Sequence, residues 1–399
     1  MSPTAPATRT VRVGIERLLD EDRSLVADAR VALVSNPASI DGRIRHAAGI
    51  LADDPGINLV ALFGPQHGFR SDLQDNMIET PHARDTRRRI PIYSLYSETR
   101  EPTAEMLRDV DVLVIDLQDV GTRVYTYIYT MANCMRAAAR HGVRVVICDR
   151  PNPVGGTAVE GAILRPEWAS FVGQFPIPLR HVMTVGEIAR LFNQEFSIGA
   201  ALDIVPLEGW RRSMYFDDTG LPWVMPSPNI PTLDSTIVYP GAVLFEGTML
   251  SEGRGTTRPF ELIGAPWIDG DALADAMNAR GLPGVHFRAT FFEPTFQKHA
   301  KQTCGGCQLH VIDREAFQPV RAAVELIAEC KRQAPDDFAW RQPPYEYEHD
   351  KWPIDILYGS DRLRTTIDSG GAISRLIASW REDEDAFRKT REKYLMYQR

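Results

Sequence analysis

The stretch VDVLVIDLQDVGTRVYTYIYTMANCMRAAARHGVRVVICD, residues 110–149, decides the fold class. Two runs of apolar and β-branched residues, Val110–Asp116 and Val143–Asp149, flank a segment with a helical pattern, Thr126–His141. The two runs are continuously apolar and do not alternate, as expected for strands that are covered on both faces of a sheet. A strand, a helix and a second strand in this order are typical of a parallel βαβ unit. The stretch therefore predicts an α/β fold with a parallel sheet.

Similar patterns extend this prediction toward both ends of the chain. Further short apolar runs predict strands at Val11–Ile15, Val31–Ser35, Leu59–Phe63, Ile92–Leu95 and Leu202–Pro206. Helical patterns lie between them at Ile40–Asp53, Thr103–Asp109 and Thr184–Phe196. The last of these begins with Thr184 and has Glu187 three residues later, which is the signature of a capping box.

The second half of the chain has a different character. Residues 210–266 are rich in Pro, Gly, Trp and Ser and have few periodic runs, which is typical of functional loops. Regular patterns resume after Asp269, with helices near Ala272–Ala279 and Phe317–Lys331, strands at Val285–Phe291 and Gln308–Ile312, and a helical C-terminal end. We therefore predict a larger domain over residues 11–265 and a smaller α+β domain over residues 266–399.

Composition narrows the class of protein. The 399 residues include 45 Lys and Arg against 53 Asp and Glu, a net charge of −8, which argues against a nucleic-acid-binding surface. The chain has no apolar stretch of about 18 residues, so no membrane-spanning segment is expected. The first ten residues lack the apolar core of a signal peptide, and the five cysteines are too scattered for a disulfide framework. These features favour a cytoplasmic protein.

Polar side chains gather after three of the predicted strands. In an open parallel sheet, ligands bind beyond the carboxyl ends of the strands, so these segments form the first candidate site. Each of them delivers carboxylates together with an Arg or a His; they are Gly64–Glu79, Asp116–Tyr127 and Asp149–Gly156. A strand-end Asp can instead cap a helix or a turn, and an Arg beside it can form a structural ion pair instead of binding an anionic group.

A later segment, Ser251–Glu261, combines two Arg, two Glu and two Gly with three hydroxyl side chains, which suits the recognition of anions or hydroxyl groups. The spacing of a phosphate-binding loop, the dinucleotide fingerprint and the Gly-x-Ser-x-Gly elbow are all missing from the chain. Cys304 and Cys307 form a single CxxC pair, which is too little for a structural zinc site. An oxygen-rich divalent-metal site is an alternative, although no compact ligand motif supports it; its ligands would be His67, Asp116, Asp119, Asp149 and His181. We expect no metal and no cofactor.

Five motifs in and around these segments resemble the exo-β-N-acetylmuramidase family of glycoside hydrolases. They are FGPQHGFR (63–70), QDNMIET (74–80), DLQDVGTRVYTYIYTM (116–131), DRPNPVGG (149–156) and SEGRGTTRPFE (251–261). The resemblance covers nearly the whole chain, and PSPNIPT (226–232) and YPG (239–241) also fit it. It implies a Rossmann-like N-terminal domain that holds the active site and a smaller C-terminal domain. It also implies the release of N-acetylmuramic acid from the non-reducing end of peptidoglycan fragments, with a sugar or muropeptide as the partner.

The chain departs from the family pattern at two positions. Other branches resemble FGPEHGFRG in the first loop, whereas this chain has Gln66 in place of the Glu and Ser71 in place of the Gly. If that Glu is the acid in those branches, a Gln cannot protonate a leaving oxygen in its place. Glu79 or Asp75 would then act as the acid, or the chain would act on a different sugar.

The family chemistry suggests a role for each candidate residue. A 2-acetamido sugar can use its own amide as the nucleophile, so the protein supplies an acid and a group that orients the amide or a water molecule. We expect Asp116 or Asp119 in the orienting role, and His67 and Tyr125 on the ring hydroxyls. An Arg suits the lactyl carboxylate of muramic acid, and the candidates are Arg123, Arg150 and Arg254. Further expected substrate contacts are Gln66, Arg70, Asn152, Glu252 and Arg258.

Three alternatives stay open at this point. The same Asp and His loops could build a metal-dependent hydrolase, or the chain could be an enzyme acting on another sugar. The Gln in the first loop also allows a non-catalytic protein that binds cell-wall fragments.

Overall fold

A seven-stranded sheet dominates the N-terminal half of the computed structural model, which describes residues 11–75 and 77–398. Residues 1–10, on which the expectation that no leader is present depended, lie outside the described residues. The strand order is β3-β4-β2-β1-β5-β6-β9, and only β3 and β4 pair antiparallel. The strands are β1 (Arg30–Ser35), β2 (Asn58–Gly64), β3 (Ala83–Asp85), β4 (Ile90–Ser94), β5 (Val112–Asp116), β6 (Arg144–Cys148) and β9 (Leu202–Val205).

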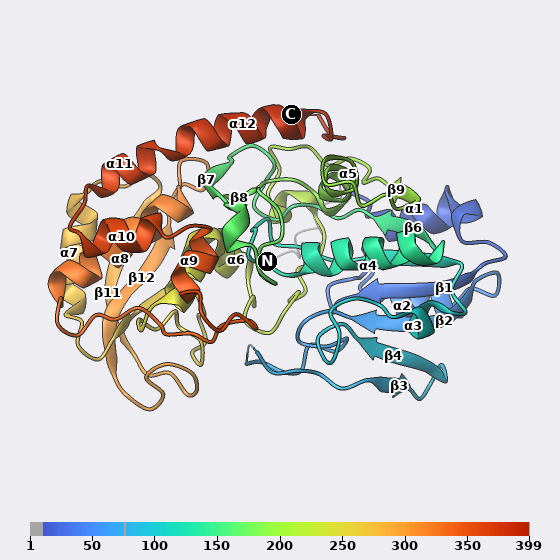
Figure 1. Ribbon diagram of the computed structural model, residues 1–399, viewed down its shortest axis with the longest axis horizontal. Coiled ribbons are helices and arrows are strands. Elements are labelled where there is room, and N and C mark those ends of the chain that lie inside the picture. The colour runs from blue at the N-terminus through green and yellow to red at the C-terminus, as the bar shows by residue number, and fades with distance from the viewer. Residues whose placement is uncertain (1–10, 76, 399) are drawn as a thin grey trace, which may run out of the picture.

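Helices cover both faces of this sheet (Figure 1). Within β1, Leu33 faces one hydrophobic core and Val34 faces the other, because successive side chains of a strand point to opposite faces. The helices of the Val34 side are α3 (Ala104–Leu107), α4 (Tyr127–His141) and α5 (Val185–Glu195), and those of the Leu33 side are α1 (Gly14–Asp20) and α2 (Ala47–Asp53). This confirms the α/β prediction, and it explains why the strands are apolar along their whole length.

The predicted strand Val11–Ile15 is wrong. The chain turns into α1 at Gly14, because the Glu16 carboxylate accepts a hydrogen bond of 3.1 Å from the Val13 N–H and closes the first turn. The Gly14 N–H donates to the Asp149 carbonyl at 3.0 Å, and a Cβ at Gly14 would lie only 2.4 Å from the Asp149 nitrogen. The glycine therefore lets the helix begin against the end of β6.

The predicted helix Ile40–Asp53 is helical only from Ala47. Ile40 and His46 form an isolated β-bridge, and Ile44 between them has a φ of 62°, which a helix cannot contain. By contrast, the predicted capping box of α5 is confirmed, since the Thr184 side chain accepts from the Glu187 N–H while the Glu187 carboxylate accepts from the Thr184 N–H.

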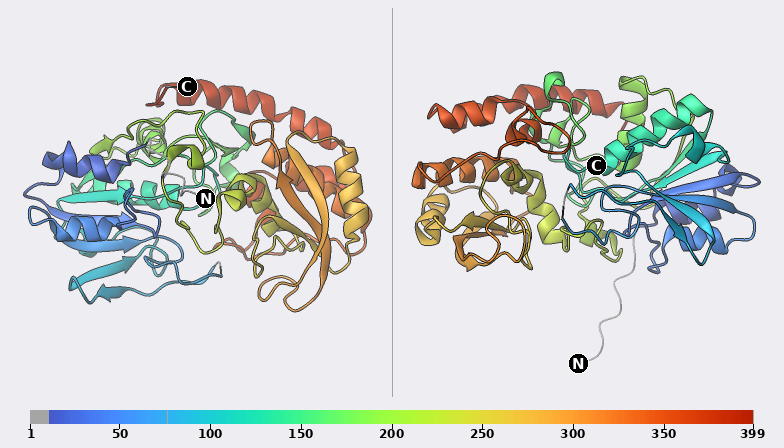
Figure 2. Two further views of the ribbon diagram at one scale, coloured as in Figure 1. Left: turned by 180° about the vertical axis from the view of Figure 1, so that it is seen from behind. Right: turned by 60° about the horizontal axis from the view of Figure 1, so that its bottom comes forward.

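The C-terminal half is built on a separate antiparallel sheet of order β10-β12-β11. Figure 2 shows the two sheets in opposite halves of the molecule. The strands are β10 (Leu262–Ala265), β11 (Val285–Phe292) and β12 (Cys304–Val311), and the helices near them are α6 (Leu233–Ala242), α7 (Gly270–Ala279) and α8 (Pro319–Gln333). The segment expected to be irregular thus contains α6 and β10. The domain boundary at residue 265 stays a prediction, although β10, which precedes it, pairs with β12.

The Cys-Gly-Gly-Cys sequence forms the start of β12, and both of its cysteines are free and buried. A Cβ at Gly305 would lie 2.2 Å from the Ile268 carbonyl oxygen, and one at Gly306 would lie 2.0 Å from that of Ile263. The two glycines therefore let neighbouring backbone pack closely over the strand.

The last helices return the chain to the N-terminal half. Figure 1 shows α12 along the top of the molecule, ending above that half. The Arg391 guanidinium donates to the Val182 carbonyl at 3.2 Å, and the Tyr397 hydroxyl donates to the Asp149 carboxylate. The remaining elements are α9 (Pro353–Tyr358), α10 (Arg362–Asp368), α11 (Ile373–Ala378), α12 (Trp380–Glu392) and a small antiparallel pair, β7 (Glu160–Ile163) and β8 (Pro178–Arg180).

Candidate active site

A cavity of about 40 Å³ lies where the two halves of the molecule meet. The N-terminal half contributes the segments that follow β2 and β5, which are on opposite sides of β1 in the sheet. Strand order reverses at this point, which is where open α/β sheets bind ligands. The C-terminal half contributes α6, the 3₁₀ helix Val243–Gly247, the segment around Arg254 and the segment 345–346.

The loop after β2 places His67 at the cavity, and a hydrogen bond to the backbone fixes the tautomer of its ring. His67 has a φ of 70°, and its Nδ1 lies 2.8 Å from the Leu73 carbonyl oxygen. Burial lowers the pKa of His67 to about 4, so the ring is neutral near pH 7. Because a carbonyl oxygen only accepts, Nδ1 carries the proton and Nε2 is left as an acceptor. His67 can therefore accept a hydrogen bond from a ligand hydroxyl.

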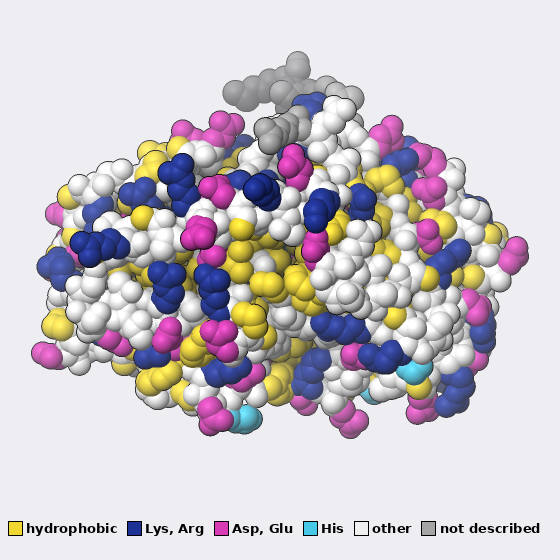
Figure 3. Space-filling model, turned by 45° about the horizontal axis from the view of Figure 1, so that its top comes forward, with side chains coloured by type: hydrophobic (Ala, Val, Ile, Leu, Met, Phe, Trp, Pro, Cys, Tyr) yellow, Lys and Arg dark blue, Asp and Glu magenta, His cyan; other side chains and the backbone are white. Residues whose placement is uncertain are grey.

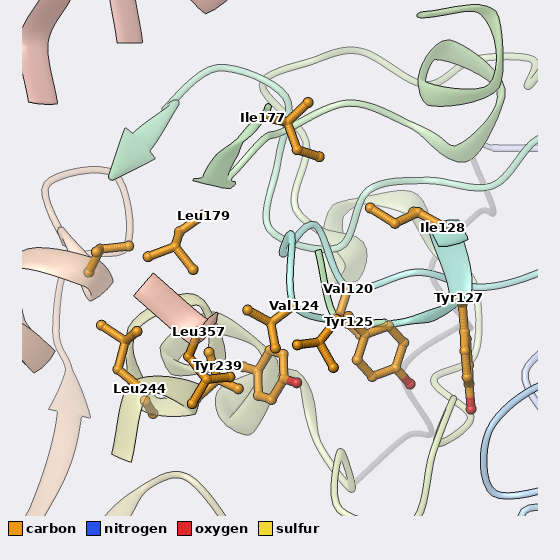
Figure 4. Close-up of a cluster of buried hydrophobic side chains, with 14 of the residues drawn as sticks. Val120, Val124, Tyr125, Tyr127, Ile128, Ile177, Leu179, Tyr239, Leu244 and Leu357 are labelled. Carbon is orange, nitrogen blue, oxygen red and sulfur yellow. The ribbon is translucent and has the colours of Figure 1, made fainter. Parts of the chain in front are cut away.

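The segment after β5 brings aromatic rings to the cavity. Figure 4 shows Tyr125 between Tyr127 and Tyr239; Tyr125 lies just before α4, Tyr127 is the first residue of α4, and Tyr239 belongs to α6. The ring centroids of Tyr125 and Tyr127 are 4.6 Å apart, and those of Tyr125 and Tyr239 are 5.9 Å apart. Burial raises the pKa of all three phenols, which are thus neutral donors. These rings and Phe260 give the cavity an apolar wall.

Gln66 lies between the two halves and joins them through its side-chain amide. The Thr126 hydroxyl donates to Gln66 Oε1 at 2.8 Å, and Gln66 Nε2 donates to Glu346 Oε1 at 3.0 Å. All three side chains are buried and line the cavity. The amide thus connects the beginning of α4 to a carboxyl group that is 280 residues further along the chain.

Glu346 is one of two buried carboxyl groups in the cavity. Its second oxygen, Oε2, accepts a hydrogen bond of 2.8 Å from the Tyr96 hydroxyl. Burial raises the pKa of Glu346 to about 6, although the bonds from Tyr96 and Gln66 act in the opposite direction. The residue has a φ of 44°, a conformation that non-glycine residues adopt rarely and that is found at functional sites. Glu346 is therefore poised to gain and lose a proton near neutral pH.

Glu246 is the second carboxyl group, and its surroundings favour the ionised form. Arg254 Nη2 lies 2.7 Å from Glu246 Oε1, and the Tyr345 hydroxyl donates to Oε2 at 2.8 Å. Burial on its own raises the pKa of Glu246, but Arg254 and Tyr345 outweigh it, and the pKa is lowered overall. Two carboxyl groups whose pKa values move apart in one cavity are typical of an acid and a partner that stays charged.

Arg254 forms a second ion pair, with Glu252. Glu252 Oε1 is 3.2 Å from Arg254 Nε, and Glu252 Oε2 is 2.6 Å from Lys298 Nζ. Two carboxylates and two cations thus balance one another in this buried group. Arg254 Nη1 is buried and makes no hydrogen bond to the described residues, which leaves one guanidinium donor for a ligand at the cavity.

The carboxylates that the sequence favoured lie outside the residues that line the cavity. Glu79 is half exposed and contacts Arg100 at 2.9 Å, and Asp75 accepts a hydrogen bond from Gln297. Asp116 is fully buried and forms a two-fold ion pair with Arg150, with N–O distances of 2.5 and 2.9 Å.

Asp119 is also buried away from the cavity wall. It accepts a hydrogen bond of 2.6 Å from the Gly121 N–H and lies 3.4 Å from the His181 ring. Its hydrogen bond to Gly121 closes the turn after β5, so Asp119 shapes the segment that carries Tyr125.

Of the expected substrate-binding residues, the structure brings Gln66, Tyr125 and Arg254 to the cavity, together with the expected catalytic residue His67. Glu252 forms an ion pair with Arg254 but does not line the cavity. The others are placed elsewhere in the described part of the chain. Arg123 is buried and donates to the carbonyls of three residues, and Asn152 bonds to backbone on both sides; Arg150 pairs with Asp116, Arg70 is exposed, and Arg258 contacts Glu261.

Glu246, Glu346 and Tyr96 were missed by sequence reasoning. A local signal exists for two of them. Glu246 is the single charged residue in the apolar run Val243–Gly247, and Glu346 lies in the sequence Tyr-Glu-Tyr-Glu, residues 345–348. A carboxyl group set among large apolar residues is a candidate for burial and hence for a shifted pKa.

Metal-binding clusters and membrane-spanning helices are both absent from the described residues. No group of three or more His, Cys, Asp or Glu side chains there is arranged to hold a metal ion. No helix in the described ranges is both long and apolar enough to cross a membrane. On the face shown in Figure 3, Lys and Arg side chains are interspersed with Asp and Glu.

The sequence matches two family models over most of its length. The model described as "Exo-beta-N-acetylmuramidase NamZ, N-terminal" matches residues 31–234, and the corresponding C-terminal model matches residues 237–397. The chain is also 48% identical over 387 residues to a protein of Bacillus subtilis (strain 168), the peptidoglycan beta-N-acetylmuramidase NamZ. That alignment covers 97% of this chain and 91% of the relative.

Two crystal structures of DUF1343 family proteins from Bacteroides fragilis NCTC 9343 have the same fold. The first has a TM-score of 0.89 and 34% sequence identity, and the match covers 98% of this chain and all of the other. The second has a TM-score of 0.77 and 28% identity, with coverage of 97% and 99%. On these matches, the chain belongs to the exo-β-N-acetylmuramidase NamZ family.

Proposed function

We propose that this protein is an exo-acting β-N-acetylmuramidase that releases N-acetylmuramic acid from the non-reducing end of peptidoglycan fragments, and that the reaction takes place in the cavity between the two halves. The observation that carries the proposal is the pair of buried carboxyl groups, Glu246 and Glu346, in a protein of this family. The reducing, cytoplasmic location expected from the sequence is part of the same proposal.

The pair meets the chemical requirement of glycoside cleavage. One group must protonate the leaving oxygen, and a second must stabilise the positive charge that develops at the anomeric carbon or orient the attacking group. Glu246, held ionised by Arg254 and Tyr345, suits the second role. With a 2-acetamido sugar, it can hold the amide N–H while the amide oxygen approaches the anomeric carbon.

The rest of the cavity suits an amino sugar with an acidic substituent. Tyr125 and Tyr239 offer ring faces and neutral hydroxyls to a sugar, and His67 Nε2 accepts from a sugar hydroxyl. The free Nη1 of Arg254 is a partner for the lactyl carboxylate that distinguishes muramic acid from glucosamine.

Substrate entry requires the loops around the cavity to move. A volume of about 40 Å³ holds a few water molecules, whereas sites for small ligands have about 300–1,000 Å³. Two contacts join the segment after β2 to the C-terminal half: Asp75 bonds to Gln297, and Met77 Sδ lies 3.5 Å from the Glu346 nitrogen. Opening of these contacts would expose Glu346.

A pair of chromogenic substrates tests the proposal. The purified protein is incubated with a β-N-acetylmuramide and, separately, with the β-N-acetylglucosaminide that has the same leaving group. We expect release from the muramide and at least tenfold less from the glucosaminide, since the latter lacks the group that Arg254 would bind. Release from the glucosaminide alone would contradict the substrate assignment. A folded protein that binds muramides and cleaves neither compound would instead support the non-catalytic alternative.

A further inference from the structure

One connected chain of hydrogen bonds determines the position of the Glu346 carboxyl group. The Thr126 hydroxyl holds the Gln66 oxygen, the Gln66 amide N–H points to Glu346 Oε1, and the Tyr96 hydroxyl points to Glu346 Oε2. Each oxygen of the carboxyl group therefore faces a neutral donor from the N-terminal half. The carboxyl group itself comes from the C-terminal half and lines the cavity.

Burial favours the protonated form of Glu346 more strongly than its two hydrogen-bond partners favour the ionised form. A carboxamide and a phenol donate hydrogen bonds without supplying a full charge, so they do not force the carboxyl group to ionise as an arginine would. Glu246 has such an arginine, Arg254, at 2.7 Å. Of the two carboxyl groups of the cavity, only Glu346 can hold a transferable proton near neutral pH.

The amide side chain at position 66 is consistent with a proton that stays on Glu346. A Gln cannot itself donate a proton to a leaving oxygen, but it can hold the neighbouring carboxyl group through its N–H. A Glu at this position would put a second carboxyl group about 3 Å from Glu346, and two such groups compete for one proton. With Gln66, the proton belongs to Glu346 alone.

We propose that Glu346 is the catalytic proton donor of the glycosidase and that Gln66 and Tyr96 are positioning residues. In this step, the bond between the anomeric carbon and the bridging oxygen breaks, and its electron pair goes to that oxygen. The proton of Glu346 moves to the same oxygen, which leaves as an alcohol. An oxygen of the acetamido group or of water then bonds to the anomeric carbon. Net addition of one water completes the free sugar and returns a proton to Glu346. The inference rests on the function proposed above.

Dependence on the leaving group tests this role directly. A sugar alcohol must be protonated as it leaves, whereas 2,4-dinitrophenolate leaves without a proton. We expect Glu346→Gln to lower kcat/KM by about 10²–10⁴-fold on a disaccharide with N-acetylmuramic acid at its non-reducing end. The same variant should lose less than about tenfold on the 2,4-dinitrophenyl muramide. Glu348→Gln, two residues along the same segment, is the matched control, and it should keep both activities.

The pH profile of the unchanged protein provides a second test that needs no variant. Disaccharide cleavage should fall above a pH of about 6, where Glu346 loses its proton, and dinitrophenyl muramide cleavage should not. Equal losses on both substrates in Glu346→Gln, or profiles of the same shape for both substrates, would overturn the role of Glu346 and leave the proposed function intact. An unchanged protein that cleaves neither substrate would overturn the function and the inference together.

Discussion

Two buried carboxyl groups, those of Asp116 and Glu346, differ in their hydrogen-bond partners. This difference distinguishes a structural ion pair from a candidate acid. Asp116, at the end of β5, has no exposed surface and is neutralised by the guanidinium of Arg150. Glu346 is also buried, but its partners are an amide and a phenol, and it lines the cavity. Burial alone is therefore a poor indicator of a catalytic acid. The charge of the hydrogen-bond partners and the access to a cavity decide the role.

The same comparison distinguishes the two carboxyl groups within the cavity. Glu246 has a guanidinium partner, like Asp116, but it also faces the space in which a substrate would lie. It thus combines a fixed negative charge with access to ligand, which is what a developing positive charge requires. The comparison predicts that changes at Asp116 affect folding and that changes at Glu246 affect turnover.

The largest effect is expected at Glu246. Glu246→Gln removes the negative charge that we propose acts at the anomeric carbon, and kcat on muramides should fall by about 10²–10⁴-fold. Unlike Glu346→Gln, this variant should lose as much on the dinitrophenyl muramide as on the disaccharide, because its role does not depend on protonation of the leaving group. Steady-state kinetics on both substrates measure the effect. A loss confined to the disaccharide would mean that the two carboxyl groups have exchanged roles.

Asp116→Asn should act on stability. It leaves the buried Arg150 guanidinium without its charged partner, which costs about 3–5 kcal/mol of the free energy of unfolding. Denaturant unfolding measures this, and the kcat of the folded fraction should be unchanged. A loss of turnover of a hundredfold or more in a variant of normal stability would return Asp116 to the reaction, as the sequence first suggested.

Much of the fold was accessible from the sequence because it depends on local patterns. The apolar runs of β1, β2, β5 and β6 and the capping box of α5 are visible in short windows of sequence. Those strands also pointed to half of the cavity, since Gln66 and His67 lie in the segment after β2 and Tyr125 lies in the segment after β5.

The other half of the cavity could not be predicted in the same way. Glu246 and Glu346 reach it from segments that lie far along the chain, and only the packing of the two halves brings them to Gln66. Glu79 and Asp75 were favoured because they are near that loop in sequence. Glu79 lies on the outer side of that segment, half exposed and in contact with Arg100, whereas Asp75 bonds to Gln297 and does not line the cavity.

A smaller effect is expected at Tyr96. The Tyr96 hydroxyl donates to the Glu346 carboxylate and so lowers the pKa of Glu346, which burial raises. Tyr96→Phe removes this donor, and the pKa should rise above its present value of about 6. The fall of disaccharide cleavage at high pH should therefore move upward by about one pH unit, a shift of the size that one hydrogen bond to a charged group supports. A downward shift, or none, would show that Tyr96 does not hold the catalytic carboxyl group.

The smallest effect is expected at Glu79, the acid that the sequence favoured. Its carboxylate is 51% exposed and lies 2.9 Å from Arg100 Nη2 and 3.1 Å from the Tyr347 hydroxyl. Exposed ion pairs contribute about 0–1 kcal/mol, so Glu79→Gln should change the free energy of unfolding by no more than that. Turnover of both muramides should stay within about threefold of the unchanged protein, since the group has no access to the cavity. Because Glu79 contacts Tyr347, the neighbour of Glu346, a small rise in KM is compatible with this placement. A hundredfold loss restricted to the disaccharide is not, because it would mean that the segment after β2 moves inward and supplies the acid in place of Glu346.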